Sequence, residues 1–253
     1  MLAKKRVAHH FSKAVAQYDE VSTFHRLCAE KLCQSIKNDL TDHVKILEVG
    51  SFTGVLTKQL QAINPNTTII RTDLHLAGAR QENIPANWSF IQADGEQPPF
   101  KEAQFDLIVS NACFQWFHQL EQSLPKLIKL LKPNGKLCFS QFTTPSLEPV
   151  HSWYNEIQRS NSFLKLLSPT ELQRICSSYE LISFNKFMQS YDFTNFSELR
   201  TYLKHMGIQA PSESSQRMTR EQYQHLQDLV KTTIERDKYI NLQMAAALVL
   251  IKA

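Results

Sequence analysis

Short apolar or β-branched runs alternate along this chain with stretches in which apolar residues recur every three or four positions. The short runs have the length of strands, and the stretches between them have the period of amphipathic helices. Strands are therefore predicted at residues 44–49, 67–72, 89–93, 105–110 and 136–142, and helices at residues 54–63, 120–131 and 147–158. A closing pair of strands is expected at residues 181–193 and 242–251. Apolar strands separated by helices are typical of a mostly parallel sheet covered on both faces, so the pattern predicts an α/β fold.

Two helical segments stand outside this alternation, at residues 7–38 before the first strand and at residues 195–238 between the last two. Open α/β sheets bind their ligands at the carboxyl ends of the strands, and extra helices can cover that edge. We therefore expect a single domain over residues 1–253, with an N-terminal helical cap at 7–38 and a helical lid insertion at 195–238.

The composition narrows the class of protein. Of 253 residues, 42% are hydrophobic and 21% charged, which supplies a full core, and a net charge of +4 is far from a nucleic-acid-binding composition. The five cysteines form no C-x-x-C pair, so reduced thiols are expected rather than disulfides or a metal site. No apolar run reaches the roughly 20 residues of a membrane-spanning helix, and the N-terminus does not read as a secretory signal. We expect a cytoplasmic protein that binds neither membrane nor nucleic acid.

The strand at 44–49 runs into a turn with two glycines, which allows backbone amides to approach a ligand closely. Asp73 follows Glu48 by 25 residues and ends the second strand, where an acid can accept both hydroxyls of a ribose. Asp94 ends the third strand, where a carboxylate can accept an adenine amino group. The predicted cofactor-binding residues are Glu48, Gly50, Ser51, Gly54, Asp73, Leu74, Asp94, Gly95 and Asn111.

Residues 48–54 resemble motif I of class I S-adenosylmethionine-dependent methyltransferases, E/D-x-G-x-G-x-G, with Glu48, Gly50 and Gly54 matching and Phe52 in place of the middle glycine. Further segments are similar to the malonyl-acyl-carrier-protein O-methyltransferase family of biotin synthesis. They are residues 11–19 (FSKAVAQYD), 105–111 (FDLIVSN) with 114–116 (FQW), 131–137 (LKPNGKL), 167–172 (LSPTEL) and 203–207 (LKHMG). This resemblance covers nearly the whole chain.

The resemblance implies a Rossmann-like class I methyltransferase sheet, S-adenosyl-L-methionine as cofactor, and methylation of the free carboxylate of a malonyl group on acyl carrier protein or coenzyme A. A malonyl carboxylate is ionised near neutral pH, so its attack on a sulfonium methyl group requires alignment and desolvation rather than a general base. The candidate substrate residues are Tyr18, Arg26, Gln115 and Trp116. His25 stands where this family usually has Gln, which leaves its role open.

An acidic carrier protein would be recognised by exposed basic residues, for which Lys4, Lys5 and Arg6 form one cluster and Lys126, Lys129 and Lys132 another. Two alternatives remain open at this point. The chain could methylate another small carboxylic acid or acyl thioester. It could also be a binding or regulatory protein that keeps the fold but has lost cofactor affinity through Phe52, because a side chain there has no glycine to relieve a positive φ.

Overall fold

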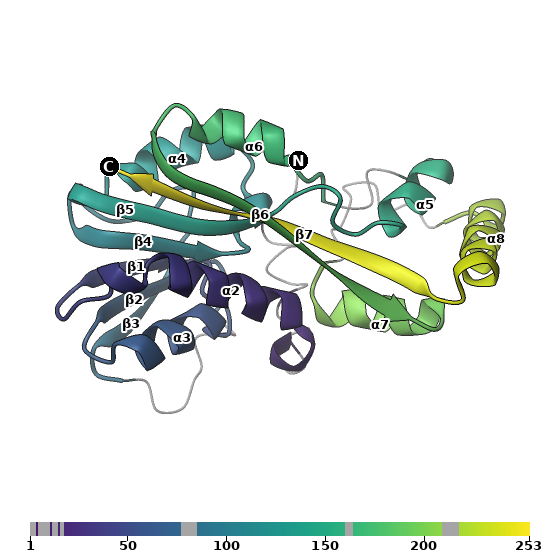
Figure 1. Ribbon diagram of the computed structural model, residues 1–253, viewed down its shortest axis with the longest axis horizontal. Helices are drawn as coiled ribbons and strands as arrows, with labels where there is room; N and C mark the ends of the chain where they lie inside the picture. Colours follow the sequence, from purple (N-terminus) through teal and green to yellow (C-terminus); the bar gives the residue numbers. More distant parts are fainter. Residues whose placement is uncertain are drawn as a thin grey trace.

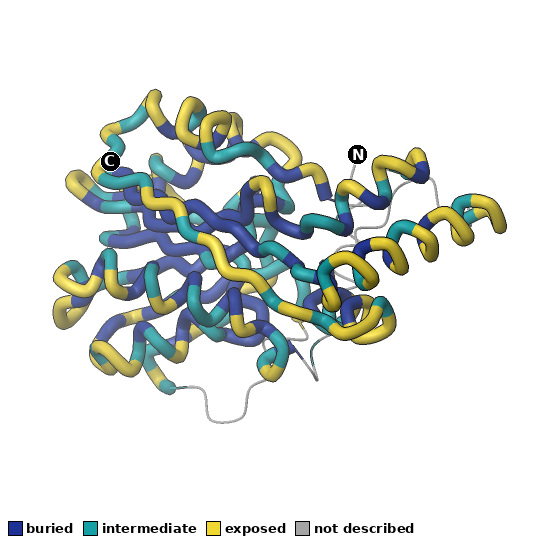
Figure 2. The backbone as a smooth tube through the Cα atoms, turned by 45° about the vertical axis from the view of Figure 1, so that its right-hand side comes forward, coloured by how far each residue is buried: buried dark blue, intermediate teal, exposed yellow. Residues whose placement is uncertain are grey.

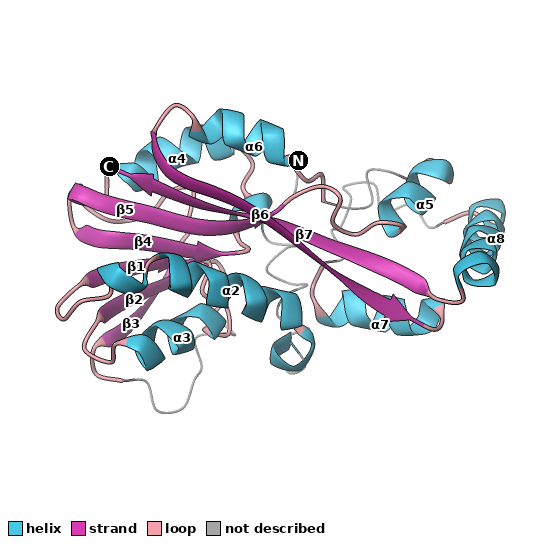
Figure 3. Cartoon of the chain, viewed as in Figure 1, coloured by secondary structure: helices cyan, strands magenta, loops and turns pink. Residues whose placement is uncertain are grey.

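A seven-stranded sheet with helices on both faces forms the centre of the protein (Figure 1, Figure 3). The computed structural model describes Lys4, Phe11, Val15 and residues 18–76, 85–159, 164–208 and 218–253. The strands are β1 (Lys45–Val49), β2 (Thr68–Asp73), β3 (Trp88–Gln92), β4 (Phe105–Asn111), β5 (Leu131–Phe142), β6 (Glu180–Phe193) and β7 (Ile240–Lys252). The helices are α2 (Thr23–Ser35), α3 (Val55–Ile63), α4 (Leu120–Ile128), α5 (Val150–Glu156), α6 (Pro169–Cys176), α7 (Phe196–His205) and α8 (Arg220–Asp237), with short 3-10 turns η1 (Lys37–Asp39) and η3 (Phe114–Trp116).

The strands lie in the order β3-β2-β1-β4-β5-β7-β6. Pairing is parallel from β3 through to β5, and β7 runs antiparallel to both of its neighbours. The predicted α/β fold with a mostly parallel sheet is therefore confirmed. The order of the strands reverses between β1 and β4, and in such sheets ligands bind outside the carboxyl ends at that switch point.

Both faces of the sheet are buried, which explains why its central strands are almost continuously apolar. Ile46 packs in a cluster with Leu32 of α2 and Leu56 of α3. Its neighbour Leu47 points to the opposite face and packs in a cluster with Leu124 of α4. Successive residues of β1 thus enter two different cores, as the period of two in a strand requires.

The predicted helix at 120–131 is three residues too long, because α4 ends at Ile128 and Leu131 already belongs to β5. Leu131 pairs with Phe105, and the regular ladder resumes only at Leu107 and Lys136. Residues 131–137, which precede and overlap the strand predicted at 136–142, therefore form the irregular first part of β5. Asn134 has a φ of 65° there, a conformation that Asn tolerates better than most residues.

The last two strands extend beyond the rest of the sheet. β6 pairs with β7 over its full length, from Glu180 opposite Lys252 to Phe193 opposite Ile240, whereas the pairing of β5 with β7 ends at Ala246. The extension carries α7 and α8, which fall within the predicted insertion at 195–238 (Figure 1). As the tube in Figure 2 shows, buried residues recur along α8 although most of the helix is exposed.

These projecting elements share one apolar core with α2 and the end of β5. It joins Trp153 of α5, Leu199 of α7, Leu226 of α8 and Leu242 of β7, and Phe24 of α2 belongs to the same cluster. Because α2 lies within the predicted cap at 7–38, the cap and the insertion meet in one core on this side of the sheet. The described residues of the predicted cap are Phe11, Val15 and residues 18–38, which include α2, and the remainder lies outside the described residues.

Two buried ionisable residues lie beneath the turn that follows β1. Glu48 and Arg71 are neighbours across the parallel β1 and β2, and each is about 1% exposed. The Thr57 hydroxyl of α3 donates a hydrogen bond to the Glu48 carboxylate. Burial raises the pKa of Glu48 to about 7, although Thr57 and the charge of Arg71 act in the opposite direction.

This raised pKa predicts a stability that falls as the pH rises. Between about pH 4.5 and 7 the folded protein holds a proton on Glu48 that the unfolded chain has lost, so the free energy of unfolding decreases through that window. A shift from 4.5 to about 7 corresponds to about 3 kcal/mol at most, at about 1.4 kcal/mol for each pH unit. Glu48→Gln should abolish this loss, so urea unfolding curves from pH 4.5 to 7.5 should favour the variant increasingly over the wild type. Glu30→Gln, on the exposed side of α2, is the matched control, and a constant difference between Glu48→Gln and wild type would contradict the prediction.

Candidate functional site

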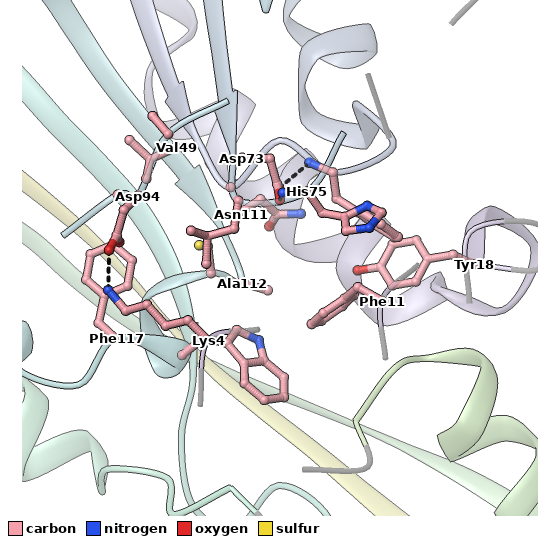
Figure 4. Close-up of a pocket in the computed structure, with 17 residues that line it drawn as sticks. Lys4, Phe11, Tyr18, Val49, Asp73, His75, Asp94, Asn111, Ala112 and Phe117 are labelled. Carbon is pink, nitrogen blue, oxygen red and sulfur yellow. Dashed lines mark hydrogen bonds and ion pairs between the residues drawn. The ribbon is translucent and has the colours of Figure 1, made fainter. Parts of the chain in front are cut away.

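A cavity opens at the carboxyl ends of β1, β2 and β4, where the strand order reverses (Figure 4). It has about 730 Å³ of empty space including the part open to solvent, a size typical of small-molecule sites. Most of its walls are apolar, and carboxylates enter it from the ends of β2 and β3. The cavity therefore combines apolar walls with a few polar groups that can orient a ligand.

The turn after β1 is fixed to the end of β2. Gly50 and Ser51 both donate their backbone N–H groups to the Thr72 carbonyl, at 2.8 and 2.9 Å. Gly50 has a φ of 75°, and a Cβ at this position would lie 2.3 Å from Cys113 Sγ. A side chain is therefore excluded at residue 50 both by the backbone conformation and by the end of β4.

Asp73 is held by the same turn. Its two carboxylate oxygens accept the backbone N–H groups of Phe52 and His75, each at 2.9 Å, and its side chain lines the cavity beside Leu74. Burial raises the pKa of Asp73 while these two N–H donors lower it. Because a carboxylate has about four lone-pair sites, Asp73 keeps acceptor capacity for the hydroxyls of a ribose.

Asp94 and Gly95 form the next part of the wall, just after β3. A Cβ on Gly95 would lie 2.6 Å from Val49 Cγ1 and 2.9 Å from Phe117 Cζ, so glycine lets this turn pack against the end of β1. The Lys4 ammonium pairs with Asp94 at 2.5 Å and with Glu96 at 2.6 Å, and Figure 4 shows its side chain at the cavity. The basic residues at the N-terminus suggested a surface for an acidic partner, whereas Lys4 is paired at the cavity and Lys5 and Arg6 lie outside the described residues.

Asn111 connects the cavity to α2. Its side-chain amide donates to the His25 carbonyl at 3.0 Å and its oxygen accepts from the Ser140 hydroxyl at 2.7 Å. His25 itself is buried, and burial lowers its pKa to about 3, so its ring is neutral at physiological pH. The ring lies between Tyr18 and Phe142, with centroid distances of 5.3 and 4.9 Å.

Four aromatic rings form one side of the cavity. Phe52 meets Tyr18 edge to face at 4.7 Å between centroids and Phe11 at 5.2 Å, and Phe11 meets Trp116 at 5.4 Å. Tyr18 is buried, and Figure 4 shows its hydroxyl directed into the cavity. Burial raises the pKa of Tyr18 above its ordinary value, so the phenol stays protonated.

Phe52 adopts the positive φ that the motif predicts, at 39°. Such a conformation costs a residue with a Cβ on the order of 1–3 kcal/mol. Its N–H donates to Asp73 at 2.9 Å and its carbonyl accepts from Arg71 Nη2 at 3.2 Å, while the ring contacts contribute about 0.5–1.5 kcal/mol each. The ring therefore packs with Tyr18 and Phe11 on the aromatic side of the cavity.

The structure gathers part of the predicted site and leaves part outside the cavity wall. Among the predicted cofactor-binding residues, Gly50, Asp73, Leu74, Asp94, Gly95 and Asn111 line the cavity, as do Tyr18 and Trp116 among the predicted substrate residues. Glu48, Ser51 and Gly54 lie outside the wall: Glu48 bonds Thr57, Ser51 donates its N–H to Thr72, and Gly54 starts α3 with a φ of 77°. Their contribution is to the shape of the turn.

Arg26 and Gln115 are both bonded to the backbone. Arg26 donates to the Asp19 carbonyl. Gln115 is buried, donates to the Ala112 carbonyl at 2.7 Å and accepts from the Phe142 N–H at 3.3 Å. Their roles toward a substrate stay predictions, and the contacts that they make in this structure orient α2 and the end of β4.

Sequence reasoning missed several residues of the wall, among them Lys4, Phe11, Val49, His75, Cys113 and Phe117. Phe11 could have been predicted as a site residue, because it is the first residue of the N-terminal segment that resembles the family. Lys4 and Cys113 had no such signal, since their places depend on how distant segments meet. Burial raises the pKa of the Cys113 thiol, so this cysteine is a wall residue rather than a thiolate.

The polar groups and walls of this cavity fit a nucleoside cofactor. Asp73 can accept ribose hydroxyls, Asp94 can accept an adenine amino group, and Leu74, Val49 and Phe117 supply an apolar setting for the base. Within the described ranges, no group of three or more His, Cys, Asp or Glu residues is arranged to hold a metal ion. In the same part of the chain, no helix has both the length and the apolar character needed to cross a membrane.

Comparison with known proteins agrees with this geometry. Residues 47–139 match the family model described as "Methyltransferase domain". The malonyl-[acyl-carrier protein] O-methyltransferase of Halalkalibacterium halodurans is 30% identical over 248 residues, covering 89% of this chain and 90% of the relative. The enzyme of that name from Priestia megaterium is 29% identical over 235 residues, with 85% of each chain covered.

A solved methyltransferase-type structure from Bacillus halodurans shares the fold, with a TM-score of 0.64 over 88% of this chain and 97% of the other, at 17% identity. The residues that match motif I, the strand order and the relatives that align over most of their length lead to one assignment. This chain belongs to the malonyl-[acyl-carrier protein] O-methyltransferase family of class I methyltransferases.

Proposed function

We propose that this chain methylates the free carboxylate of a malonyl group carried as a thioester on acyl carrier protein, an early step of biotin synthesis. The observation that carries the proposal is the division of the cavity into two parts. One part presents Asp73 and Asp94 at the strand ends, and the other presents Tyr18 among aromatic rings. The first part suits a nucleoside, and the second suits a small acyl group that must be oriented and kept from water.

S-adenosylmethionine supplies the methyl group as part of a sulfonium when it is bound. Asp73 would accept its ribose hydroxyls and Asp94 its adenine amino group, after exchange of the Lys4 contact. Phe117, Leu74 and Val49 would enclose the base. The absence of a side chain at Gly50 lets the turn lie close to Cys113, and this turn would supply backbone groups to the cofactor.

Tyr18 is the residue that we propose to hold the acceptor. Its hydroxyl is a neutral donor, so it can orient a carboxylate oxygen without forming an ion pair that would reduce the nucleophilicity of the carboxylate. Trp116 and Phe11 pack beside it and limit the access of water. An acceptor that is already ionised then needs alignment in this wall and no proton transfer to a protein base.

We propose acyl carrier protein as the carrier of the malonyl group. The three lysines of the second predicted basic cluster do not share one helix, because α4 ends at Ile128 and Lys132 belongs to β5. Each of them is engaged: Lys126 donates to the Glu96 carbonyl at 3.1 Å, Lys129 pairs with Glu102 at 3.6 Å, and Lys132 pairs with Asp106 at 2.8 Å. These contacts reduce the positive charge that the three lysines offer to an acidic carrier. The names of the aligned relatives support acyl carrier protein, and coenzyme A is the alternative carrier.

The extension formed by α7, α8 and the ends of β6 and β7 is the lid in this proposal, and α2 with Tyr18 is the cap. Their shared apolar core joins the two, so a substrate would enter between covering elements that are packed together.

The direct test is to incubate the protein with labelled S-adenosylmethionine and malonyl-acyl-carrier protein and to detect a methyl ester on the malonyl group by mass spectrometry. Malonyl-coenzyme A and free malonate are the parallel substrates. Product on the carrier protein supports the proposal, product on free malonate alone favours the small-acid alternative, and no cofactor binding by calorimetry favours the binding-protein alternative.

Asp73→Ala should weaken cofactor affinity by at least about 10-fold, because it removes the acceptor of the ribose hydroxyls. Isothermal calorimetry with S-adenosylhomocysteine measures this. Asp73→Asn, which keeps one oxygen to accept the Phe52 N–H, should lose less, and Asp192→Ala on the exposed part of β6 should lose nothing. Unchanged affinity in Asp73→Ala would remove this residue from the cofactor site.

Tyr18→Phe should lower kcat/KM for the malonyl substrate by about 10- to 100-fold, the value of one hydrogen bond to a charged group, and leave cofactor affinity unchanged. The ring and its contact with Phe52 remain in this variant, so its fold should be intact. Initial rates at saturating cofactor measure the effect. A full-rate variant would show that the substrate is oriented by another group.

The rate of methyl transfer should be nearly independent of pH between about 6 and 9. The acceptor is ionised there, the pKa of Tyr18 is raised by burial, and burial lowers the pKa of His25 to about 3. Single-turnover rates across this range test the point. Burial raises the pKa of Glu48 to about 7, so the same series of rates in Glu48→Gln identifies any pH dependence that is caused by Glu48. A rate that rises tenfold for each pH unit in both proteins would indicate a general base and contradict the mechanism.

A further inference from the structure

Residue 52 is the position at which this chain departs from the glycine pattern of its motif, and the structure connects its side chain to the cap. We propose that Phe52 is a positioning residue, whose ring fastens the segment around Tyr18 to the cofactor turn and so sets the place of the Tyr18 hydroxyl. The inference rests on the proposed function, because it concerns how the same cavity orients its acceptor.

The first support is the direction in which the backbone holds the ring. Phe52 has a φ of 39°, and both of its backbone polar groups are bonded: the N–H to Asp73 at 2.9 Å and the carbonyl to Arg71 at 3.2 Å. A fixed backbone at this position fixes the direction of the Cα–Cβ bond. The ring therefore leaves the turn in one direction, toward the N-terminal segment.

The second support is what the ring meets there. Its centroid is 4.7 Å from that of Tyr18, with the ring planes at 90°, and 5.2 Å from that of Phe11. Phe52 and Tyr18 are 9% and 6% exposed, so the contact between them is largely closed to water. Edge-to-face pairs have a preferred geometry, so this contact orients the Tyr18 ring in addition to burying it.

The third support is a polar contact one residue further along both segments. The Thr53 hydroxyl donates to Asp19 Oδ1 at 2.6 Å, and Lys58 of α3 pairs with Asp19 Oδ2 at 3.3 Å. Residues 18 and 19 are thus fastened to residues 52 and 53 by an aromatic pair and a polar pair side by side. We call this pair of contacts the cap latch.

The cap latch connects the two parts of the cavity. Asp73, which faces the cofactor part, holds the Phe52 N–H, and Phe52 holds Tyr18, which faces the acceptor part. A glycine at residue 52 would keep the backbone contacts and lose the ring. The cofactor part would then remain intact while Tyr18 lost its support from the turn.

Phe52→Gly tests this directly, because glycine accepts the positive φ without strain. We expect kcat/KM for malonyl-acyl-carrier protein to fall at least 10-fold, while the Kd of S-adenosylhomocysteine changes less than threefold. Phe52→Leu should retain an intermediate rate. Phe100→Leu, which removes a ring that packs on Phe105 on another part of the sheet, is the matched control and should keep both values.

A double-mutant cycle with Tyr18→Phe distinguishes positioning from a general structural effect. If Phe52 acts by placing the Tyr18 hydroxyl, the Phe52→Gly change should lower the rate much less when that hydroxyl is already absent. Equal losses in the two backgrounds would overturn the inference. A loss confined to cofactor affinity would also overturn it, since the ring would then be a wall of the cofactor part.

Hydrogen exchange supplies a readout that does not depend on activity. Phe52→Gly and Asp19→Ala should each speed exchange in residues 18–26 at least fivefold and leave β4 unchanged. Unchanged exchange in residues 18–26 would overturn the latch. Faster exchange in a protein whose wild type fails to methylate any malonyl thioester would support the latch and reject the proposed function, so the two failures are distinguishable.

Discussion

The arrangement of the site depends on one carbonyl group, that of Thr72 at the end of β2, which accepts the N–H groups of both Gly50 and Ser51. These two hydrogen bonds bend the chain sharply as it leaves β1. The bend brings Phe52 to the Asp73 carboxylate, and Arg71 completes the hold on the Phe52 carbonyl. The ribose acceptor and the aromatic side of the cavity are therefore placed by the same turn.

The glycine at residue 50 follows from this constraint. The bend needs a φ of 75°, and the end of β4 stands so close that a Cβ would lie 2.3 Å from the Cys113 sulfur. Residue 52 is under a weaker constraint. Its φ of 39° is unfavourable for a residue with a Cβ, but the side chain has room to pack against Tyr18 of the cap. Replacement of glycine by Phe is therefore compatible with the fold at residue 52 and excluded at residue 50.

Much of this fold could be predicted from the sequence. Buried parallel strands are almost continuously apolar, so acidic residues at their ends are easily recognised. Asp73 and Asp94 were found in that way, and both line the cavity. The end of α4 was predicted wrongly, since Leu131 fits a helical period as well as it fits the pairing with Phe105 that the structure shows.

The hydrogen-bond partners of individual polar side chains could not be predicted from the sequence, for a different reason. Gln115 sits in a motif segment, yet its amide bonds the backbone of Ala112 and Phe142, groups that come together only in the folded sheet. Lys4 was one of a run of basic residues, and its pairing with Asp94 joins positions 90 residues apart. A period along the chain identifies which strand a residue belongs to, whereas these contacts depend on the distance between segments in space.

The titration behaviour around the cavity fits the chemistry that the family performs. Burial raises the pKa of Tyr18, Asp73 and Cys113 and lowers that of His25, so each of these groups is shifted toward its neutral form. A carboxylate that enters such surroundings gives up part of its hydration and gains few charged partners in return. Esterification removes that charge, and poor solvation favours a step in which an anion and a cation give neutral products. The aromatic side of the cavity therefore assists this reaction through its low polarity, and the Tyr18 hydroxyl on that side faces the space where the acceptor would lie.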